Sequence, residues 1–161
     1  METVKTFEGH LSGEGLKFGL VASRFNELFS LRLLEGALEA LRQCRVNTED
    51  IVVVKVPGSY EVPLYVRELA QTGRFDALIA LGVLIRGATP HFEYISAEVT
   101  RGIGQVMREF RLPVAFGIVT ADSLEQAIER SGSKQGNKGY QAALAAVEMA
   151  TLKKHLEDGL A

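Results

Sequence analysis

A histidine that follows a short glycine-containing turn is the clearest candidate for chemistry in the sequence. Residues 86–91 read RGATPH and come directly after a run of apolar and glycine residues at 77–85. Such a run is typical of a central strand of a parallel sheet that is buried on both faces. We expect Thr89 to cap the next helix and Pro90 to occupy its first position. His91 then lies in the first turn of that helix.

The start of a helix would give His91 a distinctive setting. Its unpaired N–H groups and partial positive charge favour anions and disfavour a protonated imidazole. One hypothesis is therefore a neutral His91 that accepts a proton beside an oxyanion site, formed by backbone N–H groups near Ala88 and Thr89. The alternative is that His91 only helps to cap the helix. Open α/β sheets bind their ligands at the ends of parallel strands, where this turn is expected.

The same turn is similar to a nucleotide-binding P-loop but lacks its lysine. Gly82, Gly87 and Thr89 have the P-loop spacing, but Ala88 occupies the position of the lysine, and Pro90 and His91 follow. This argues against nucleotide hydrolysis. A small phosphate ester remains a reasonable ligand of the same backbone N–H groups.

Two further groups of residues could bind a ligand, although each could equally have a purely structural role. The glycine-rich segment 132–139 contains Lys134 and Lys138 and could close over an anion, although flexible glycine loops are common. Phe25 and Tyr60, at the ends of neighbouring strands, could hold a planar ring between them or simply fill the edge of the core.

The elements that must position these residues alternate between strand and helix. We expect strands at 16–22, 51–56, 77–85 and 114–119, and helices at about 28–44, 59–71, 90–110, 124–130 and 140–156. The first helix is expected to bury Leu28, Leu31, Leu34, Leu38 and Leu41.

The sequence also predicts two helix caps and an N-terminal arm. Ser59 is expected to cap the second helix, and Asp122 with Ser123 the fourth, which gives Asp122 a structural role. Residues 5–11 could form a short strand within an N-terminal arm, 1–15.

The pattern predicts a single α/β domain, 1–161, with three layers. A four-stranded parallel sheet would be covered by helices on both faces through right-handed crossovers. The strand ends at 25–26, 59–61, 86–91 and 116–122 should then gather along one edge.

Composition and charge exclude several classes of function. The net charge of −2 and the absence of any long Lys/Arg run argue against nucleic acid or an anionic membrane as a partner. The start of the chain lacks the apolar core of a secretory signal, so a cytoplasmic location is expected. The lone Cys44 cannot form an internal disulfide and is expected to be structural. His10, His91 and His155 lack the spacing of metal ligands, so no metal is expected.

Four segments, 23–26, 57–61, 87–94 and 136–139, carry a resemblance to a known family. With the chain between about residue 7 and 156, they make the sequence closely similar to the lumazine synthase family. The resemblance implies a flavodoxin-like fold and the penultimate step of riboflavin biosynthesis. In that step, 5-amino-6-(D-ribitylamino)uracil condenses with 3,4-dihydroxy-2-butanone 4-phosphate to give 6,7-dimethyl-8-ribityllumazine, phosphate and water. No cofactor is implied.

The resemblance also implies roles for individual residues. Phe25 would stack on the pyrimidine, and His91 would transfer protons. The other residues implied for the ribitylaminouracil are Ser59, Tyr60, Glu61, the backbone of Val83, Leu84 and Ile85, and Phe116 from a neighbouring subunit. Those implied for the butanone phosphate are Ala88, Thr89 and, from a neighbour, Arg130.

Sites between subunits imply a homo-oligomer. The resemblance implies a pentamer, and in some members an icosahedral shell of sixty subunits. The segment between Arg130 and Tyr140 contains no insertion that would obviously block a shell. Residues 5–11 would then add a strand to a neighbour's sheet.

Two rival functions remain open at this point. A riboflavin synthase of the same architecture would use two lumazine molecules and no butanone phosphate. A flavin-binding or shell-forming protein would have no turnover. The phosphate-directed residues Arg130, His91, Ala88 and Thr89 favour the lumazine synthase.

Overall fold

A computed structural model describes residues 3–132 and 136–161 of the chain. Lys134, which the sequence analysis assigned to a segment closing over an anion, therefore lies outside the described residues. The sheet consists of four strands: β1 (Phe18–Ser23), β2 (Ile51–Val56), β3 (Ala77–Ile85) and β4 (Val114–Ala121). All pair in parallel, in the order β2-β1-β3-β4. The expected parallel sheet is confirmed, with each strand beginning within two residues of its predicted position.

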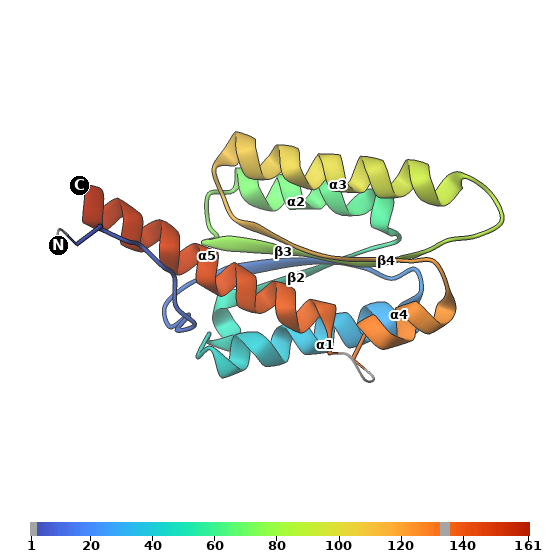
Figure 1. The fold of residues 1–161 in the computed structure, drawn as a ribbon, viewed down its shortest axis with the longest axis horizontal. Coiled ribbons are helices and arrows are strands. Elements are labelled where there is room, and N and C mark those ends of the chain that lie inside the picture. Colours follow the sequence, from blue (N-terminus) through green and yellow to red (C-terminus); the bar gives the residue numbers. More distant parts are fainter. Residues whose placement is uncertain (1–2, 133–135) are drawn as a thin grey trace.

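Five α-helices cover both faces of this sheet. They are α1 (Glu27–Gln43), α2 (Val62–Gln71), α3 (His91–Phe110), α4 (Leu124–Arg130) and α5 (Lys138–Leu160). Helices α2 and α3 lie on one face, and α1, α4 and α5 lie on the other (Figure 1). This is the flavodoxin-like three-layer arrangement that was expected. No helix in the described part of the chain is long and apolar enough to cross a membrane.

The strand β3 forms the centre of the molecule because both of its faces are covered. Every residue from Ala77 to Val83 is buried. Ile79 and Leu81 pack in the core beneath α1 and α5, whereas Leu78 and Ala80 pack in the core beneath α2 and α3. A strand inside two cores holds its last residues, and the turn after them, in a fixed place.

The buried face of α1 differs from the expected leucine stripe. Leu34 and Leu41 are buried as expected, and Leu38 is partly buried. Leu28 and Leu31, however, are exposed, and Phe29, Leu33, Ala37 and Ala40 are buried in addition. The reason is the close approach of α5, which packs small residues against this side of α1. A Cβ on Gly139 of α5 would collide with the carbonyl of Leu33. Small residues at a contact allow such an approach, and a regular stripe of leucines does not.

Two of the expected helix caps are wrong. Helix α3 begins at His91 with Pro90, not Thr89, at its N-cap, and no side chain caps it. Ser59 lies in a 3-10 helix (Ser59–Glu61) before α2, and its buried hydroxyl caps nothing. At α4 the cap is Ser123, whose Oγ accepts a hydrogen bond from the backbone N–H of Gln126 at 3.2 Å.

The N-terminal segment lies along α5 and forms no strand within the chain. The backbone N–H of His10 donates to Thr151 Oγ1 at 2.9 Å, and that hydroxyl donates to the His10 carbonyl at 3.0 Å. The ring of Phe7 meets His155 edge-on, with 5.6 Å between their centroids. Residues 5–11 thus form an arm and no strand of their own chain's sheet, and their pairing with a neighbour's sheet stays a prediction.

The single cysteine is buried, as a structural role requires. Cys44 follows α1 and has no disulfide partner. Burial raises the pKa of its thiol, which keeps the thiol protonated and unreactive.

Candidate active site

A pocket of about 860 Å³ lies at the carboxyl ends of the strands, between β1, the segment after β2, and the start of α3. Its volume is within the range typical of small-molecule sites. Three strand ends meet there, as the sequence predicted. The lining residues are Phe25, Asn26, Gly58, Ser59, Tyr60, Glu61, Leu84, Ile85, Gly87, Thr89, His91, Phe92, Tyr94, Ile95 and Glu98.

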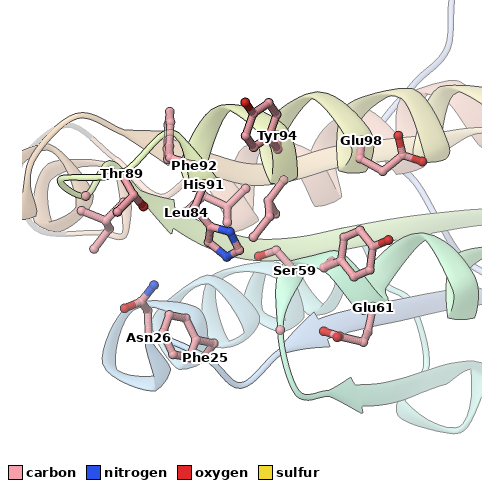
Figure 2. Close-up of a pocket in the computed structure, with 15 residues that line it drawn as sticks. Phe25, Asn26, Ser59, Glu61, Leu84, Thr89, His91, Phe92, Tyr94 and Glu98 are labelled. Carbon is pink, nitrogen blue, oxygen red and sulfur yellow. The ribbon is translucent and has the colours of Figure 1, made fainter.

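The imidazole of His91 projects from the first turn of α3 into this pocket. Figure 2 shows the ring directed toward Phe25 and Ser59, with Glu61 on the far side of the cavity. The lining thus combines an imidazole, a carboxylate, a hydroxyl and an aromatic ring. Such a set can hold a planar polar molecule and move a proton on it.

Phe25 is held at the pocket by backbone contacts of its segment. Its N–H donates to the carbonyl of Pro57 at 2.9 Å, which joins the ends of β1 and β2. The next residue, Asn26, has a left-handed backbone (φ 59°), and its Nδ2 donates to the carbonyl of Val83 at 3.2 Å. The ring of Phe25 stays 69% exposed, so it is free to stack on a ligand.

The buried hydroxyl of Ser59, which lines the pocket, has no hydrogen-bond partner among the described residues. A second unpaired hydroxyl, that of Ser23 at the end of β1, is also buried but does not line this pocket. Both lie against Gly82: a Cβ there would be 2.6 Å from Ser59 Oγ and 3.0 Å from Ser23 Oγ. An unsatisfied buried hydroxyl costs about 1–3 kcal/mol. A polar ligand group that reached the hydroxyl of Ser59 would remove that cost.

The turn before α3 offers unpaired backbone donors. Among the described residues, the N–H groups of Gly87, Ala88 and Thr89 donate to no other protein group. They precede a 20-residue helix, whose N-terminus adds partial positive charge. The turn is therefore suited to an oxyanion or a phosphate beside His91.

A second hollow, of about 1130 Å³, lies on the other side of the start of α3. It contains Phe116, Arg130 and Lys138, together with Arg86 and the outer side of Phe92. Arg130 Nη1 donates to the carbonyl of Thr120 at 3.0 Å. Phe116 and Arg130 thus do not line the pocket of their own His91.

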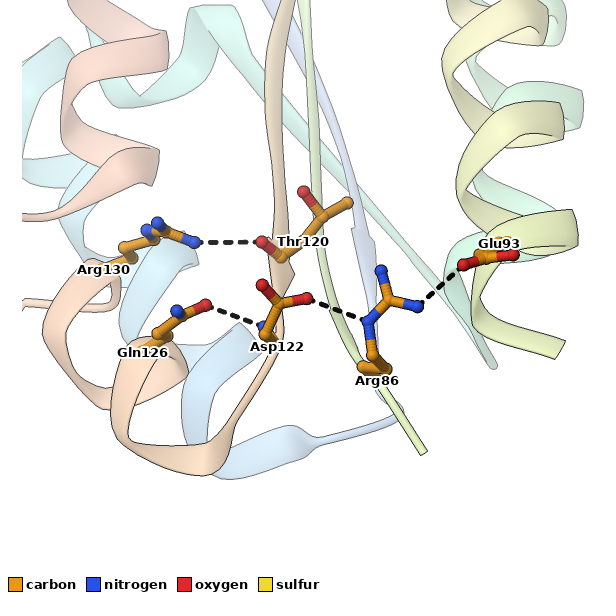
Figure 3. Close-up of polar contacts among 6 residues, drawn as sticks. All are labelled: Arg86, Glu93, Thr120, Asp122, Gln126 and Arg130. Atoms are coloured by element: carbon orange, nitrogen blue, oxygen red, sulfur yellow. Dashed lines mark hydrogen bonds and ion pairs between the residues drawn. The ribbon is translucent and has the colours of Figure 1, made fainter. Parts of the chain in front are cut away.

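An ion-pair cluster borders this second hollow (Figure 3). Arg86 Nη1 lies 2.8 Å from Glu93 Oε1, and Arg86 Nε lies 2.9 Å from Asp122 Oδ1. The hydrogen bond from the guanidinium to Glu93 and, to a smaller extent, the one to Asp122 raise the pKa of Arg86 above its usual value. The guanidinium also lies over the ring of Phe92, 4.6 Å from its centroid. Asp122 therefore has a structural partner, although the cap that was expected from it belongs to Ser123.

The structure brings together most of the residues that the sequence singled out. Phe25, Ser59, Tyr60, Glu61, Leu84, Ile85, Thr89 and His91 share one pocket. Val83 is buried beside it and contributes its carbonyl to Asn26, and Ala88 is exposed between two lining residues. Phe116 and Arg130 lie at the second hollow.

Sequence reasoning missed several residues of both hollows. Tyr94 and Glu98 line the pocket from one side of α3, and their spacing of four along a helix was the available signal. Asn26 was part of a recognised segment, and asparagine is common in left-handed backbone. No local sequence pattern indicates that Arg86 contacts Asp122, which lies 36 residues further along the chain.

Comparisons with known proteins give a consistent result. A family model described as 6,7-dimethyl-8-ribityllumazine synthase matches residues 15–154. Two proteins of that name are similar over 153 residues, which is 95% of this chain and 99% of each of them. The one from Aquifex aeolicus (strain VF5) is 54% identical, and the one from Chloroherpeton thalassium (strain ATCC 35110 / GB-78) is 52% identical.

Proposed function

The chain belongs to the 6,7-dimethyl-8-ribityllumazine synthase family, and from this we propose how its two hollows divide the work of that enzyme. It is a transferase of riboflavin biosynthesis. It condenses 5-amino-6-(D-ribitylamino)uracil with 3,4-dihydroxy-2-butanone 4-phosphate to give 6,7-dimethyl-8-ribityllumazine, phosphate and water. The assignment of residues to the two substrates is our proposal.

The pocket that contains His91 binds the ribitylaminouracil in this proposal. Phe25, exposed at the rim, stacks on the pyrimidine, and Leu84 and Ile85 contribute backbone and apolar contacts. Tyr60 covers the ring from the next segment. Ser59 and Glu61 bind the ribityl hydroxyls. The unpaired, buried hydroxyl of Ser59 is the observation that carries this assignment, because a polyol supplies the partner that the protein does not.

The turn before α3 binds the butanone phosphate. The free N–H groups of Ala88 and Thr89 are placed for the phosphate oxygens, and the helix N-terminus favours their negative charge. Arg130 of a neighbouring subunit completes the phosphate site, and the neighbour's Phe116 closes over the ribitylaminouracil. Their location at the other hollow of their own chain supports this sharing.

His91 transfers protons between the two substrates. The amine of the pyrimidine attacks the ketone, and water leaves as the imine forms. Phosphate then leaves by elimination, and the ribitylamino nitrogen closes the second ring on the remaining carbonyl with loss of another water. Each step moves a proton at an atom within reach of the imidazole. Holding the two reactants side by side supplies much of the acceleration, because orientation replaces a bimolecular encounter.

The shared site requires an oligomer, which we propose to be a pentamer that assembles further into an icosahedral shell. The strand β2 is the edge of the sheet and exposes Val52 and Val53. Such an edge can accept an added strand, and residues 5–11 of a neighbour are the proposed donor. A cytoplasmic location and the absence of nucleic-acid partners stay predictions from the sequence.

The test follows both products in one reaction. Purified protein is mixed with the two substrates, and lumazine fluorescence and phosphate release are measured above the uncatalysed background. We expect equal appearance of both products, and a loss of about 10²-fold or more in kcat/KM for Arg130→Ala, because a charged phosphate contact is removed. Arg42→Ala, which removes an exposed guanidinium paired with Glu39 on α1, is the matched control. A folded, assembled protein without acceleration would contradict the proposal.

A further inference from the structure

Arg86 occupies the point at which the turn before α3 leaves the sheet. Its N–H donates to the carbonyl of Ala121 at 2.8 Å, which extends the pairing of β3 with β4 by one residue. Its side chain contacts Glu93 in α3 and Asp122 after β4 (Figure 3). It also lies over the ring of Phe92. One side chain thus joins the strand before the turn, the helix after it, and the neighbouring strand.

The turn itself has little other support. The N–H groups at 87–89 donate to no protein group among the described residues, and Pro90 has none to donate. A Cβ on Gly87 would meet no atom within 4 Å, so the turn is not packed against a neighbour there. The contact between Arg86 and Glu93 spans the turn and fixes its two ends relative to each other.

The same guanidinium is linked to the segment that carries Arg130. Asp122 accepts from Arg86, and the Asp122 N–H donates to Gln126 Oε1 in α4 at 2.7 Å. Arg130 at the end of α4 donates to the carbonyl of Thr120, two residues before Asp122. The cluster therefore connects the turn of one half-site with the arginine of the other.

The surroundings of Arg86 argue against direct binding of the phosphate. Its one positive charge faces two carboxylates, Glu93 and Asp122, so an anion would meet net negative charge there. The pairs are also too exposed to contribute much to stability, with 44% of the Arg86 side chain and 62% and 66% of its partners accessible. Arg86 therefore neither binds the phosphate nor adds much to the stability of the fold, and the remaining role is to position the turn.

We propose that Arg86 is a positioning residue that holds the turn at 87–90 and the start of α3 against the end of β4, and so sets the affinity for the phosphorylated substrate. This inference rests on the proposed function, because it assumes that the turn binds the butanone phosphate. The guanidinium is suited to the task because its rigid fork bonds in two directions while its flat face stacks on Phe92. A lysine ammonium has neither the fork nor the face.

The test compares kcat and the KM of each substrate separately in Arg86→Ala, Arg86→Lys and Asp122→Asn. For Arg86→Ala we expect the KM for butanone phosphate to rise about tenfold and kcat to fall about tenfold, because small misplacements of reacting groups are costly. The KM for ribitylaminouracil should stay within about twofold, since the residues proposed to bind it, among them Phe25, Ser59 and Leu84, come before the turn in the chain. Arg86→Lys should recover little, and Asp122→Asn should show a smaller change with the same split.

Arg67→Ala in α2 is the matched control, because Arg67 contacts the far end of α3. Arg67 bonds both carboxylate oxygens of Glu109, at 2.6 and 2.9 Å, and lies over the ring of Phe110. Its loss should leave both KM values unchanged. An unchanged KM for butanone phosphate in Arg86→Ala, or an equal rise for both substrates with a lower Tm, would overturn the inference. Absence of activity in the wild-type enzyme would contradict the proposed function instead, and this comparison separates the two.

Discussion

Gly82 in β3 is closely packed against side chains of three neighbouring elements. A Cβ there would lie 2.6 Å from Ser59 Oγ, 3.0 Å from Ser23 Oγ and 3.2 Å from Ile118 Cδ1. We expect Gly82→Ala to lower the free energy of unfolding by about 1–3 kcal/mol, because an added methyl group in a packed region forces neighbours to shift. Chemical denaturation of the wild type and the variant measures the change.

Two comparisons make the Gly82→Ala experiment specific. In a Ser59→Ala background the closest atom is gone, so the cost of the added methyl group should be smaller. Gly87→Ala is the matched control, since its Cβ would meet no atom within 4 Å. The same cost in both backgrounds would show that Ser59 is not the limiting contact.

His91 is expected to accelerate the reaction without being indispensable. General acid–base catalysis contributes typically about 10²–10⁴-fold, and we expect His91→Ala to fall at the lower end, near 10²-fold in kcat. The remaining rate comes from holding two reactants in contact. Single-turnover kinetics, with His155→Ala on the distant α5 as the control, measure this loss. Complete inactivity of a folded, assembled His91→Ala variant would contradict the role given to orientation.

At the residue scale, the sequence predicted the site residues that lie at strand ends. It did not predict residues whose role depends on a contact with a residue far away in the chain. His91, Phe25 and Glu61 follow strands whose ends meet at one edge, so the fold class alone brings them together. Arg86 depends on Asp122, and the hydroxyl of Ser59 lies against Gly82. Such pairings follow from the packing of separate elements and have no local pattern.

At the element scale, two glycines in α3 differ in how much room they leave for a side chain. A Cβ on Gly104 would meet only the flexible end of Arg108, at 3.2 Å, whereas one on Gly102 would lie 2.8 Å from Cβ of Pro63 in α2. We expect Gly104→Ala to raise the free energy of unfolding by about 0.5–1 kcal/mol, because alanine restricts the unfolded chain. Gly102→Ala should lower it, because α2 and α3 would be pushed apart.

Thermal denaturation of the two variants side by side tests this expectation. Both substitutions add one methyl group to the same helix, so the gain in helix propensity is the same for both. The two variants differ only in what the added methyl group packs against. A rise in Tm for both, or a fall for both, would contradict the account of how α2 and α3 pack.

The elements themselves were largely predictable from the sequence. Apolar runs bounded by proline, glycine and polar residues located all four strands. For β1 and β3 the reason is that a parallel strand buried on both faces has few other sequences open to it. The buried face of α1 was not predictable, because it depends on how closely α5 approaches at Gly139. The place of the N-terminal arm was not predictable either, because its contacts with Thr151 and His155 come from the far end of the chain.

At the scale of the whole molecule, two hollows divide the candidate site residues of one chain. Among the described residues, the pocket with His91 is lined by no arginine or lysine, and the hollow with Arg130 and Lys138 is lined by no histidine. The start of α3 lies between them. Under the proposed function, the pocket of one copy faces the hollow of another, as heterologous contacts in a closed ring allow.

The most direct test of this account mixes two defective subunits. His91→Ala and Arg130→Ala chains, carrying different tags, are co-assembled in equal amounts, and mixed oligomers are purified through both tags. If His91 and Arg130 of a site come from different chains, random mixing makes about a quarter of the sites intact, and that share of wild-type activity should return. Wild-type chains taken through the same steps are the control. Activity no higher than the average of the two variants would contradict a site shared between subunits.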